Sequence, residues 1–240
     1  MTAQPPALSL IYLVYNEEDS LDRVLDDALE YVRKRLDDWE IILVDDGSSD
    51  GSPAIAARRS QAEPRIRVVT HRHNRGMGAG MASGIRAASK DWLVFMPADG
   101  QTAVGAIDRM LPLLAQADIV VTTYENARDS LVRIGLSAGL RTYMRWTAGI
   151  RFSLEGLYLF PVSAAKVIAD DIRAQTFFYS FELIDRGMQR GLTVAHTTMT
   201  YLPRAAGQSK VANLRRIYRV GREVARYAVR KRLRGRHDSP

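Results

Sequence analysis

Residues 40–52 read EIILVDDGSSDGS and join two kinds of sequence in one short stretch. The first half, up to Val44, is an apolar run with β-branched residues, which predicts a short strand buried inside a sheet. The second half begins with Asp45 and Asp46 and consists of residues that favour turns. A buried strand followed at once by acidic turn residues is typical of the sheet edge where ligands bind in α/β proteins.

The same alternation continues on both sides of this stretch. The predicted strands are 8–14, 40–44, 65–70 and 92–96, and the predicted helices are 20–36, 53–61 and the segment from the glycine-rich turn 74–80 to about residue 89. Strands that alternate with helices at this spacing imply parallel βαβ units with right-handed crossovers. We therefore expect an α/β fold with a mostly parallel central sheet flanked by helices.

The alternation weakens in the second half of the chain. Residues 124–150 predict a partly helical region with several arginines, 156–161 and 192–200 predict strands, and 177–190 predict a helix. Residues 201–210 form a predicted loop, and a basic helix follows it. We divide the chain into a domain at residues 1–210 and a basic amphipathic helix or tail at residues 211–240.

The composition limits the class of protein. The chain has 240 residues, of which 46% are hydrophobic and 25% charged, as in ordinary soluble globular proteins. Because there is no cysteine, disulfides, thiolate metal sites and cysteine nucleophiles are excluded. The first residues lack the order of a signal peptide, and no apolar run approaches the ~20 residues of a membrane span. We expect a cytoplasmic protein that does not cross a membrane.

The positive charge is concentrated at the end of the chain. Residues 201–240 hold 12 of the 34 Lys and Arg residues and only two acidic residues, Glu223 and Asp238. From residue 213 onward the cations alternate with apolar positions, a pattern that predicts an interfacial anchor on an anionic membrane. A helix that packs on the protein, or a solvated charged end, would show the same pattern. Nucleic acid is a third partner for such charge, but the main domain contains no recognition motif, so we expect no nucleic acid.

Acidic or polar residues follow three of the predicted strands. They are Tyr15-Asn16-Glu17, Asp45-Asp46 and Pro97-Ala98-Asp99-Gly100-Gln101. Because parallel strands end at one edge of a sheet, these segments predict a common site for a cation and a phosphate. Each segment taken alone is better explained by residues that simply form turns, and it is their joint occurrence that favours a site.

Several separated segments resemble one family. These are residues 13–21 (LVYNEEDSL), 40–52, 74–88 (NRGMGAGMASGIRAA), 91–101 (DWLVFMPADGQ) and 181–210. Their order resembles the large inverting family of nucleotide-sugar glycosyltransferases that adopts the Rossmann-like GT-A fold. Within it, the chain looks most like the polyprenyl or dolichyl phosphate mannosyltransferases and glucosyltransferases. The resemblance covers roughly Leu8 to Lys210.

The resemblance implies a role for each matching position on the donor side. Residues that would bind the nucleotide base and ribose are Tyr15, Glu17, Val44 and Asp46. Ala98 and Asp99 match the end of an Asp-Ala-Asp motif that binds the diphosphate through Mg²⁺ or Mn²⁺. Arg204 and Lys210 match cations that close over the phosphates. The implied donor is a GDP- or UDP-hexose.

Two departures from the family pattern concern the metal site and the first strand. Pro97 stands where the motif has its first Asp, and Leu13 replaces the usual proline. Metal binding would then rest on Asp99 and Gln101 together with the diphosphate and water, and we expect weak metal affinity because only one carboxylate remains. A different interpretation of Pro97 is a catalytically inert module that binds nucleotide-sugars.

The reaction that the resemblance implies is a direct displacement at the anomeric carbon. This reaction determines which residues the acceptor side needs. A polyprenyl phosphate is already ionised and needs positioning rather than a general base. Arg128 and Arg133 are candidates for binding that phosphate, although solvated arginines would look the same. A saccharide or other hydroxyl acceptor would instead need a carboxylate base, for which Glu182 and Glu155 are the candidates. We expect a metal-dependent hexosyltransferase that is peripheral at the cytoplasmic membrane surface; the oligomeric state stays open, with a homo-oligomer among the options.

Overall fold

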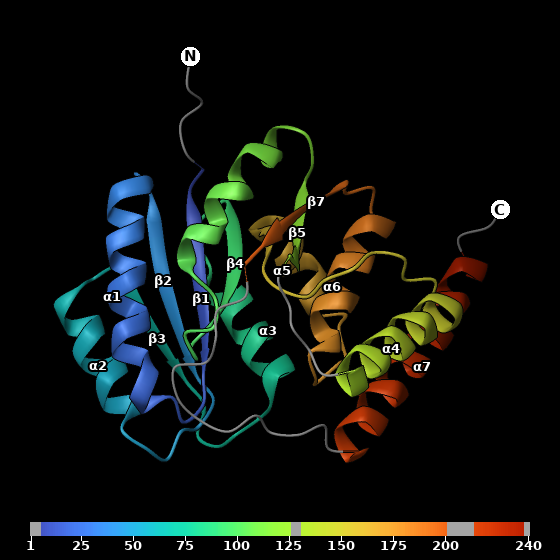
Figure 1. The fold of residues 1–240 in the computed structure, drawn as a ribbon, viewed down its shortest axis with the longest axis horizontal. Coiled ribbons are helices and arrows are strands. Elements are labelled where there is room, and N and C mark those ends of the chain that lie inside the picture. The colour runs from blue at the N-terminus through green and yellow to red at the C-terminus, as the bar shows by residue number, and fades with distance from the viewer. Residues whose placement is uncertain (1–5, 126–130, 201–213, 238–240) are drawn as a thin grey trace.

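The computed structural model describes residues 6–125, 131–200 and 214–237 (Figure 1). A central sheet contains seven strands in the order β3-β2-β1-β4-β6-β5-β7. The strands are β1 (Leu8–Val14), β2 (Trp39–Asp45), β3 (Ile66–Thr70), β4 (Trp92–Pro97), β5 (Ile119–Tyr124), β6 (Tyr158–Pro161) and β7 (Val194–Met199). All neighbouring pairs are parallel except those of β6, which runs antiparallel to β4 and β5. The predicted α/β fold with a mostly parallel sheet is confirmed.

Helices cover both faces of this sheet (Figure 1). They are α1 (Glu18–Arg35), α2 (Ser52–Ala62), α3 (Met77–Ala87), η1 (Val104–Arg109), η2 (Leu111–Ala115), α4 (Leu131–Ala148), α5 (Val162–Ala169), α6 (Phe178–Gln189) and α7 (Leu214–His237). Helix α1 has acidic residues in its first turn and basic residues in its last, as the helix dipole favours. The 3₁₀ segments η1 and η2 and the short helix α5 have no counterpart in the sequence prediction.

The strands β1 and β2 supply side chains to two separate cores. Leu8 and Leu10 face a core that includes α1, whereas Ile11 faces the core that includes α3 and α6. This alternation follows from the two-residue period of a strand. Because both faces are covered, the central strands are apolar throughout, which is why short apolar runs located them in the sequence.

The last helix, α7, packs into the second of these cores. Its residues Val220, Val224, Tyr227 and Ala228 are at most 2% exposed and belong to the same cluster as α3 and α6. The predicted boundary at residue 210 lies outside the described residues. Among the described residues, none of the helices combines the length and the apolar character needed to cross a bilayer.

Candidate functional site

The carboxyl ends of three central strands lie at one level of the sheet. Val14 pairs with Asp45 across β1 and β2, and Leu13 pairs with Pro97 across β1 and β4. This register places the polar segments that follow β1, β2 and β4 next to one another, as the sequence predicts. The site can therefore be built from these three loops.

The loops after β1 and β2 are connected by side chain to backbone hydrogen bonds. Asn16, which has a positive φ of 56°, accepts a hydrogen bond on its Oδ1 from the backbone of Ser49 at 2.9 Å. Ser52 Oγ accepts one from the backbone of Glu17, also at 2.9 Å. In the β2 loop, Asp45 Oδ1 accepts from the backbone of Ser48 at 3.0 Å. These residues therefore form turns, as the simpler interpretation of the sequence proposed, and they also fix where Glu17 lies.

A pocket of about 730 Å³ opens beside the ends of β1 and β4. Its lining includes Glu17, Ala98 and Asp99. Ser20 connects the first two, since its Oγ lies 3.1 Å from Glu17 Oε2 and 2.8 Å from Ala98 O. Most of the other lining residues are apolar, among them Met77, Met81, Leu140, Met144, Leu154, Phe177 and Phe181.

Asp99 is the carboxylate that the third strand end contributes to this pocket. Its Oδ1 accepts a hydrogen bond from the backbone of Gln101 at 3.0 Å, across Gly100 with its positive φ of 71°. Pro97 also lines the pocket but offers no ligand. Among residues 6–125, 131–200 and 214–237, no group of three or more acidic or histidine side chains could enclose a metal ion. A single carboxylate still suits Mg²⁺ or Mn²⁺, because such ions bind through one or two carboxylates, water and the substrate's phosphates.

Asp46 is buried beside the pocket and is held by three groups. Its Oδ1 lies 2.6 Å from His71 Nδ1 and accepts from the backbone of Arg75 at 2.9 Å, while its Oδ2 accepts from the backbone of Gly76 at 2.8 Å. It does not line the pocket, and neither does Val44, whose side chain lies in the core, or Tyr15, which is 44% exposed. Asp46 therefore fixes the loop that leads into α3.

His71 is a residue whose structural role the sequence did not indicate. Its Nε2 lies 2.9 Å from Ser83 Oγ on α3, so the ring connects Ser83 to Asp46. Because an ionised carboxylate only accepts hydrogen bonds, Nδ1 carries a proton. All three side chains are buried, and none lines the pocket. The hydrogen-bonded row of Ser83, His71 and Asp46 therefore holds a loop in place.

The acceptor-side candidates fall in different places. Arg128, Arg204 and Lys210 lie outside the described residues, and Arg133 lies in the first turn of α4, where side chains are not described. Glu182 lies on α6, is completely buried and does not line the pocket. It is therefore not placed as a base for an acceptor, although the sequence proposed it.

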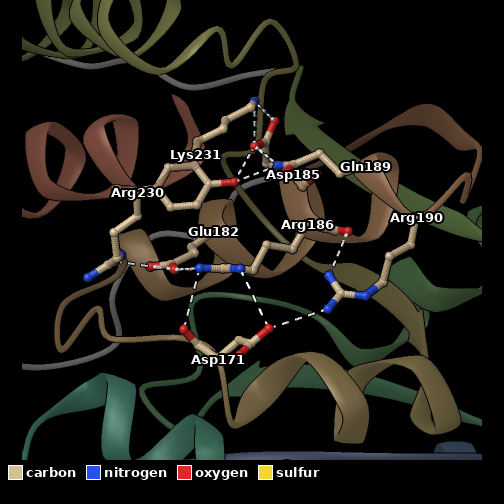
Figure 2. A network of polar contacts seen from close by, with 9 residues as sticks. Asp171, Glu182, Asp185, Arg186, Gln189, Arg190, Arg230 and Lys231 are labelled. Carbon is tan, nitrogen blue, oxygen red and sulfur yellow. Dashed lines mark hydrogen bonds and ion pairs between the residues drawn. The ribbon is translucent and has the colours of Figure 1, made fainter. Parts of the chain in front are cut away.

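Glu182 belongs instead to a network that joins α6 to α7 (Figure 2). Its Oε1 accepts from Arg186 at 2.8 Å and from Arg230 of α7 at 3.4 Å. One turn later on α6, Asp185 Oδ2 lies 2.7 Å from Lys231 Nζ. The pairing of Glu182 with Arg186, four residues apart on one helix, was visible in the sequence as a signal for a structural role.

Arg141 and Glu155 form an ion pair in the lining of the pocket. Arg141 Nη1 lies 3.1 Å from Glu155 Oε1, and Glu155 Oε2 accepts from the backbone of Tyr124 at 3.2 Å. Both residues line the pocket, so the structure brings Glu155 to the site but not Glu182. Nearby, burial raises the pKa of Tyr158 far above its usual range, which keeps this phenol protonated.

Comparison with known proteins agrees with this arrangement. The profile of glycosyl transferase family 2 matches residues 9–174. An undecaprenyl-phosphate 4-deoxy-4-formamido-L-arabinose transferase from Pectobacterium carotovorum is 35% identical over 144 residues, which cover 59% of this chain and 44% of that protein. A dolichyl-phosphate beta-glucosyltransferase from Trichomonas vaginalis is 24% identical over 223 residues, which cover 86% of this chain and 69% of that protein. The chain thus spans less than half the length of the bacterial relative.

Solved structures show the same fold. Glucosyl-3-phosphoglycerate synthase from Mycobacterium tuberculosis, crystallised with Mn²⁺, uridine diphosphate and phosphoglyceric acid, superposes with a TM-score of 0.67. The match has 20% identity and covers 94% of this chain and 78% of that one. Mannosyl-3-phosphoglycerate synthase from Rubrobacter xylanophilus gives a TM-score of 0.66 at 18% identity, over 98% of this chain and 76% of that one. The GT-A fold expected from the sequence is thereby confirmed.

Proposed function

The chain belongs to glycosyl transferase family 2, and we propose that it transfers a hexose from a nucleotide-sugar to a polyprenyl phosphate. The observation that carries the proposal is the mixed lining of the pocket beside the ends of β1 and β4. The lining combines the carboxylates of Glu17 and Asp99 with apolar side chains and the guanidinium group of Arg141. Such a pocket suits a polar donor facing an acceptor that is both anionic and lipid-linked. The names of the bacterial and protozoan relatives support this acceptor class.

On the donor side, we assign Asp99 to a divalent ion and Glu17 to the hydroxyl groups of the nucleotide-sugar. A bound Mg²⁺ or Mn²⁺ would offset the negative charge of the diphosphate as it leaves. The presence of Mn²⁺ and uridine diphosphate in the mycobacterial structure supports an ion and a UDP-sugar, with a GDP-sugar as the other candidate. Asp46 contributes indirectly, because it holds the loop before α3, which supplies Met77 to the pocket wall.

The reaction we propose is a single displacement with inversion. An oxygen of the acceptor phosphate forms a bond to the anomeric carbon while the bond from that carbon to the donor's diphosphate breaks, and the nucleoside diphosphate leaves with the electron pair. The phosphate is already ionised, so the protein needs to position it and exclude water. We assign Arg141, which lines the pocket, to the phosphate, and Leu140, Met144 and Phe177 to the first apolar units of the acceptor chain.

A hydroxyl acceptor is the second candidate, and Glu155 is the observation that favours it. This carboxylate lines the pocket and could take the proton from a hydroxyl group as the glycosidic bond forms. The catalytically inert nucleotide-sugar-binding module remains the third candidate because Pro97 replaces a metal ligand.

One experiment separates the three candidates. The purified chain is incubated with UDP- or GDP-hexoses and Mn²⁺, and product is measured with undecaprenyl phosphate, with dolichyl phosphate and with phosphoglycerate. We expect a glycolipid product with a polyprenyl phosphate. Product with phosphoglycerate alone would support the hydroxyl acceptor. Nucleotide-sugar binding without transfer or hydrolysis would support the inert module.

The setting we propose for this reaction is the cytoplasmic surface of a membrane, with the protein attached peripherally. A polyprenyl phosphate keeps its chain in the bilayer, so the enzyme must come to the lipid. The basic helix α7 is the element that the sequence offers for this purpose.

A further inference from the structure

We infer that α4 and α7 together form a docking surface for an anionic phospholipid bilayer, with Trp146 of α4 as the side chain that enters the membrane interface. This inference deepens the proposed function, on which it rests for its biological purpose, but vesicle binding can be measured without any sugar transfer. It differs from attachment through α7 alone, because α7 is not a free amphipathic helix.

The apolar side of α7 is already occupied by the protein. Val224 and Tyr227 are at most 1% exposed, in the core shared with α3 and α6. Glu182 and Asp185 of α6 bind Arg230 and Lys231 from the same side, as Figure 2 shows. A lipid bilayer would have to replace these contacts to accept this side of the helix. Membrane contact must therefore come from the outer side of α7.

That outer side is cationic and carries exposed apolar groups. Arg219, Arg222 and Arg226 are exposed, and among them lie Tyr218 and Val229, which are 71% and 56% exposed. The only acidic residue of α7 is Glu223, and it faces inward. Its carboxylate accepts hydrogen bonds from the backbone of Gln175 at 3.0 Å and from Thr176 Oγ1 at 2.6 Å. The exposed side therefore presents positive charge without a neighbouring carboxylate of the same helix.

Helix α4 extends this surface and contributes its most exposed aromatic residue. Tyr143 donates from its hydroxyl to Gly221 O at 3.2 Å, and Arg232 donates to Thr147 O at 3.3 Å, so the two helices lie side by side (Figure 1). Trp146 precedes this second contact by one residue and is 81% exposed. Helix α4 contains three arginines and no acidic residue.

An exposed tryptophan among arginines identifies the partner as a membrane interface. Indole prefers the boundary between headgroups and acyl chains, and arginine binds anionic headgroups. A solvated nucleic-acid backbone would not bury the exposed side chains of Val229 and Leu233, whereas the apolar layer of a membrane would. The other two tryptophans are Trp39, which is 1% exposed, and Trp92, which is half-buried.

The position of the surface relative to the pocket fits a lipid-linked acceptor. The inner side of α4 contributes Leu140, Arg141 and Met144 to the pocket, while its outer side carries Trp146. One helix therefore separates the proposed phosphate-binding group from the proposed membrane contact. In this arrangement, only the thickness of α4 lies between the bilayer surface and the residue proposed to bind the acceptor phosphate.

The test uses the fluorescence of Trp146 in the full chain. Vesicles of phosphatidylcholine with phosphatidylglycerol, in a normal and a brominated form, are added to the protein, and emission and co-sedimentation are recorded. We expect binding to the anionic vesicles and quenching by the brominated lipid in the wild type. In Trp146→Phe, quenching should disappear while most of the binding remains. In Trp146→Ala, the partition coefficient should fall several-fold.

Charge substitutions test the surface independently of the tryptophan. Replacing Arg222 and Arg226 by Gln should lower the partition coefficient roughly 20- to 30-fold, because each basic residue contributes about fivefold. Arg33→Gln with Lys34→Gln on α1 is the matched control, since both side chains are exposed and the change in net charge is the same. Thermal unfolding of each variant establishes that it is folded.

Three outcomes would overturn the inference. They are equal loss of binding in the α7 pair and the α1 control, bound protein whose Trp146 is not quenched, and preferential binding of duplex DNA or RNA through the same residues. The proposed function is tested by a separate measurement. Transfer to a short-chain polyprenyl phosphate in detergent should be unchanged in Trp146→Ala, and absence of transfer in the wild type, with vesicle binding intact, would reject the enzyme assignment alone.

Discussion

The Nδ1 atom of His71 lies 2.6 Å from Oδ1 of Asp46, and the two side chains together fix the loop between β3 and α3. The same carboxylate accepts hydrogen bonds from the backbone of Arg75 and Gly76. The first turn of α3, which follows this loop, meets the segment before α6 at Gly78, where a Cβ would lie 2.3 Å from Ala174 O. Only glycine permits that approach, and Gly78 N donates to Gln175 O at 3.1 Å.

Replacing His71 should lower the stability of the folded protein, although His71 does not line the pocket. His71→Phe keeps a ring of similar size but leaves Asp46 and Ser83 without this partner. We expect the free energy of unfolding to fall by about 1–3 kcal/mol, because buried polar groups lose a hydrogen bond. Urea denaturation of the wild type and the variant measures this loss, with Arg72→Ala, an exposed neighbour, as the control. Equal midpoints for His71→Phe and the wild type would contradict the role assigned to the ring.

Asp99→Asn tests the proposed metal ligand. The amide keeps the size of the side chain but removes its charge, so transfer that depends on Mn²⁺ should fall roughly 100-fold or more. Asp37→Asn is the control, because it makes the same chemical change at an exposed position that does not line the pocket. A near-normal rate for Asp99→Asn across a Mn²⁺ titration would exclude it as a ligand.

Pro97→Asp tests the same site in the opposite direction. Residue 97 ends β4 and lines the pocket two positions before Asp99, so an aspartate there would supply a second carboxylate. We expect half-maximal activity at a lower Mn²⁺ concentration, since affinity for a hard cation rises with the number of charged ligands. An unchanged or higher Mn²⁺ requirement in a folded variant would show that the ion lies elsewhere.

The pair formed by Arg141 and Glu155 distinguishes the two acceptor classes. For a phosphate acceptor, Arg141→Gln should raise the KM for that acceptor about tenfold or more through the loss of a charged hydrogen bond. Glu155→Gln should leave kcat and its pH dependence largely unchanged, because no base is needed. For a hydroxyl acceptor, Glu155→Gln should instead lower kcat and remove the acidic limb of the pH profile. Steady-state kinetics of both variants decides between them.

Glu223→Ala tests how firmly α7 is joined to the domain. The substitution removes the acceptor for the backbone of Gln175 and for both donors of Thr176. Stability should fall by about 1–3 kcal/mol, since hydrogen bonds to a charged group are lost at a partly buried position. Arg222→Ala, the exposed neighbour, is the matched control. Deletion of the whole helix is a poor test of membrane attachment, because it would remove Val224 and Tyr227 from the core.

Much of the fold could be predicted from the sequence, for identifiable reasons. The runs that became β1 and β2 are buried on both faces, so their apolar character was continuous. The register of β1 with β4 brought Glu17 and Asp99 to one pocket, as the predicted strand ends implied. These features can be predicted from the sequence because the apolar run of a strand and the turn residues after it each occupy only a few consecutive positions.

Other assignments depended on partners far away in the chain. The burial of Glu182 depends partly on Arg230, 48 residues later, and the role of His71 depends on Asp46, 25 residues earlier. Likewise, the apolar side of α7 has the same pattern whether it meets a protein core or a lipid. Periodicity records that a surface is apolar but does not record what covers it.

Helix α4 has one side in the pocket wall and the other in solvent, and this arrangement has a kinetic consequence. An enzyme resting on a leaflet through that helix would meet its lipid substrate by lateral diffusion, in two dimensions. Its velocity would then follow the mole fraction of acceptor in the bilayer, and diluting the vesicles at fixed lipid composition would leave the turnover of each bound molecule unchanged.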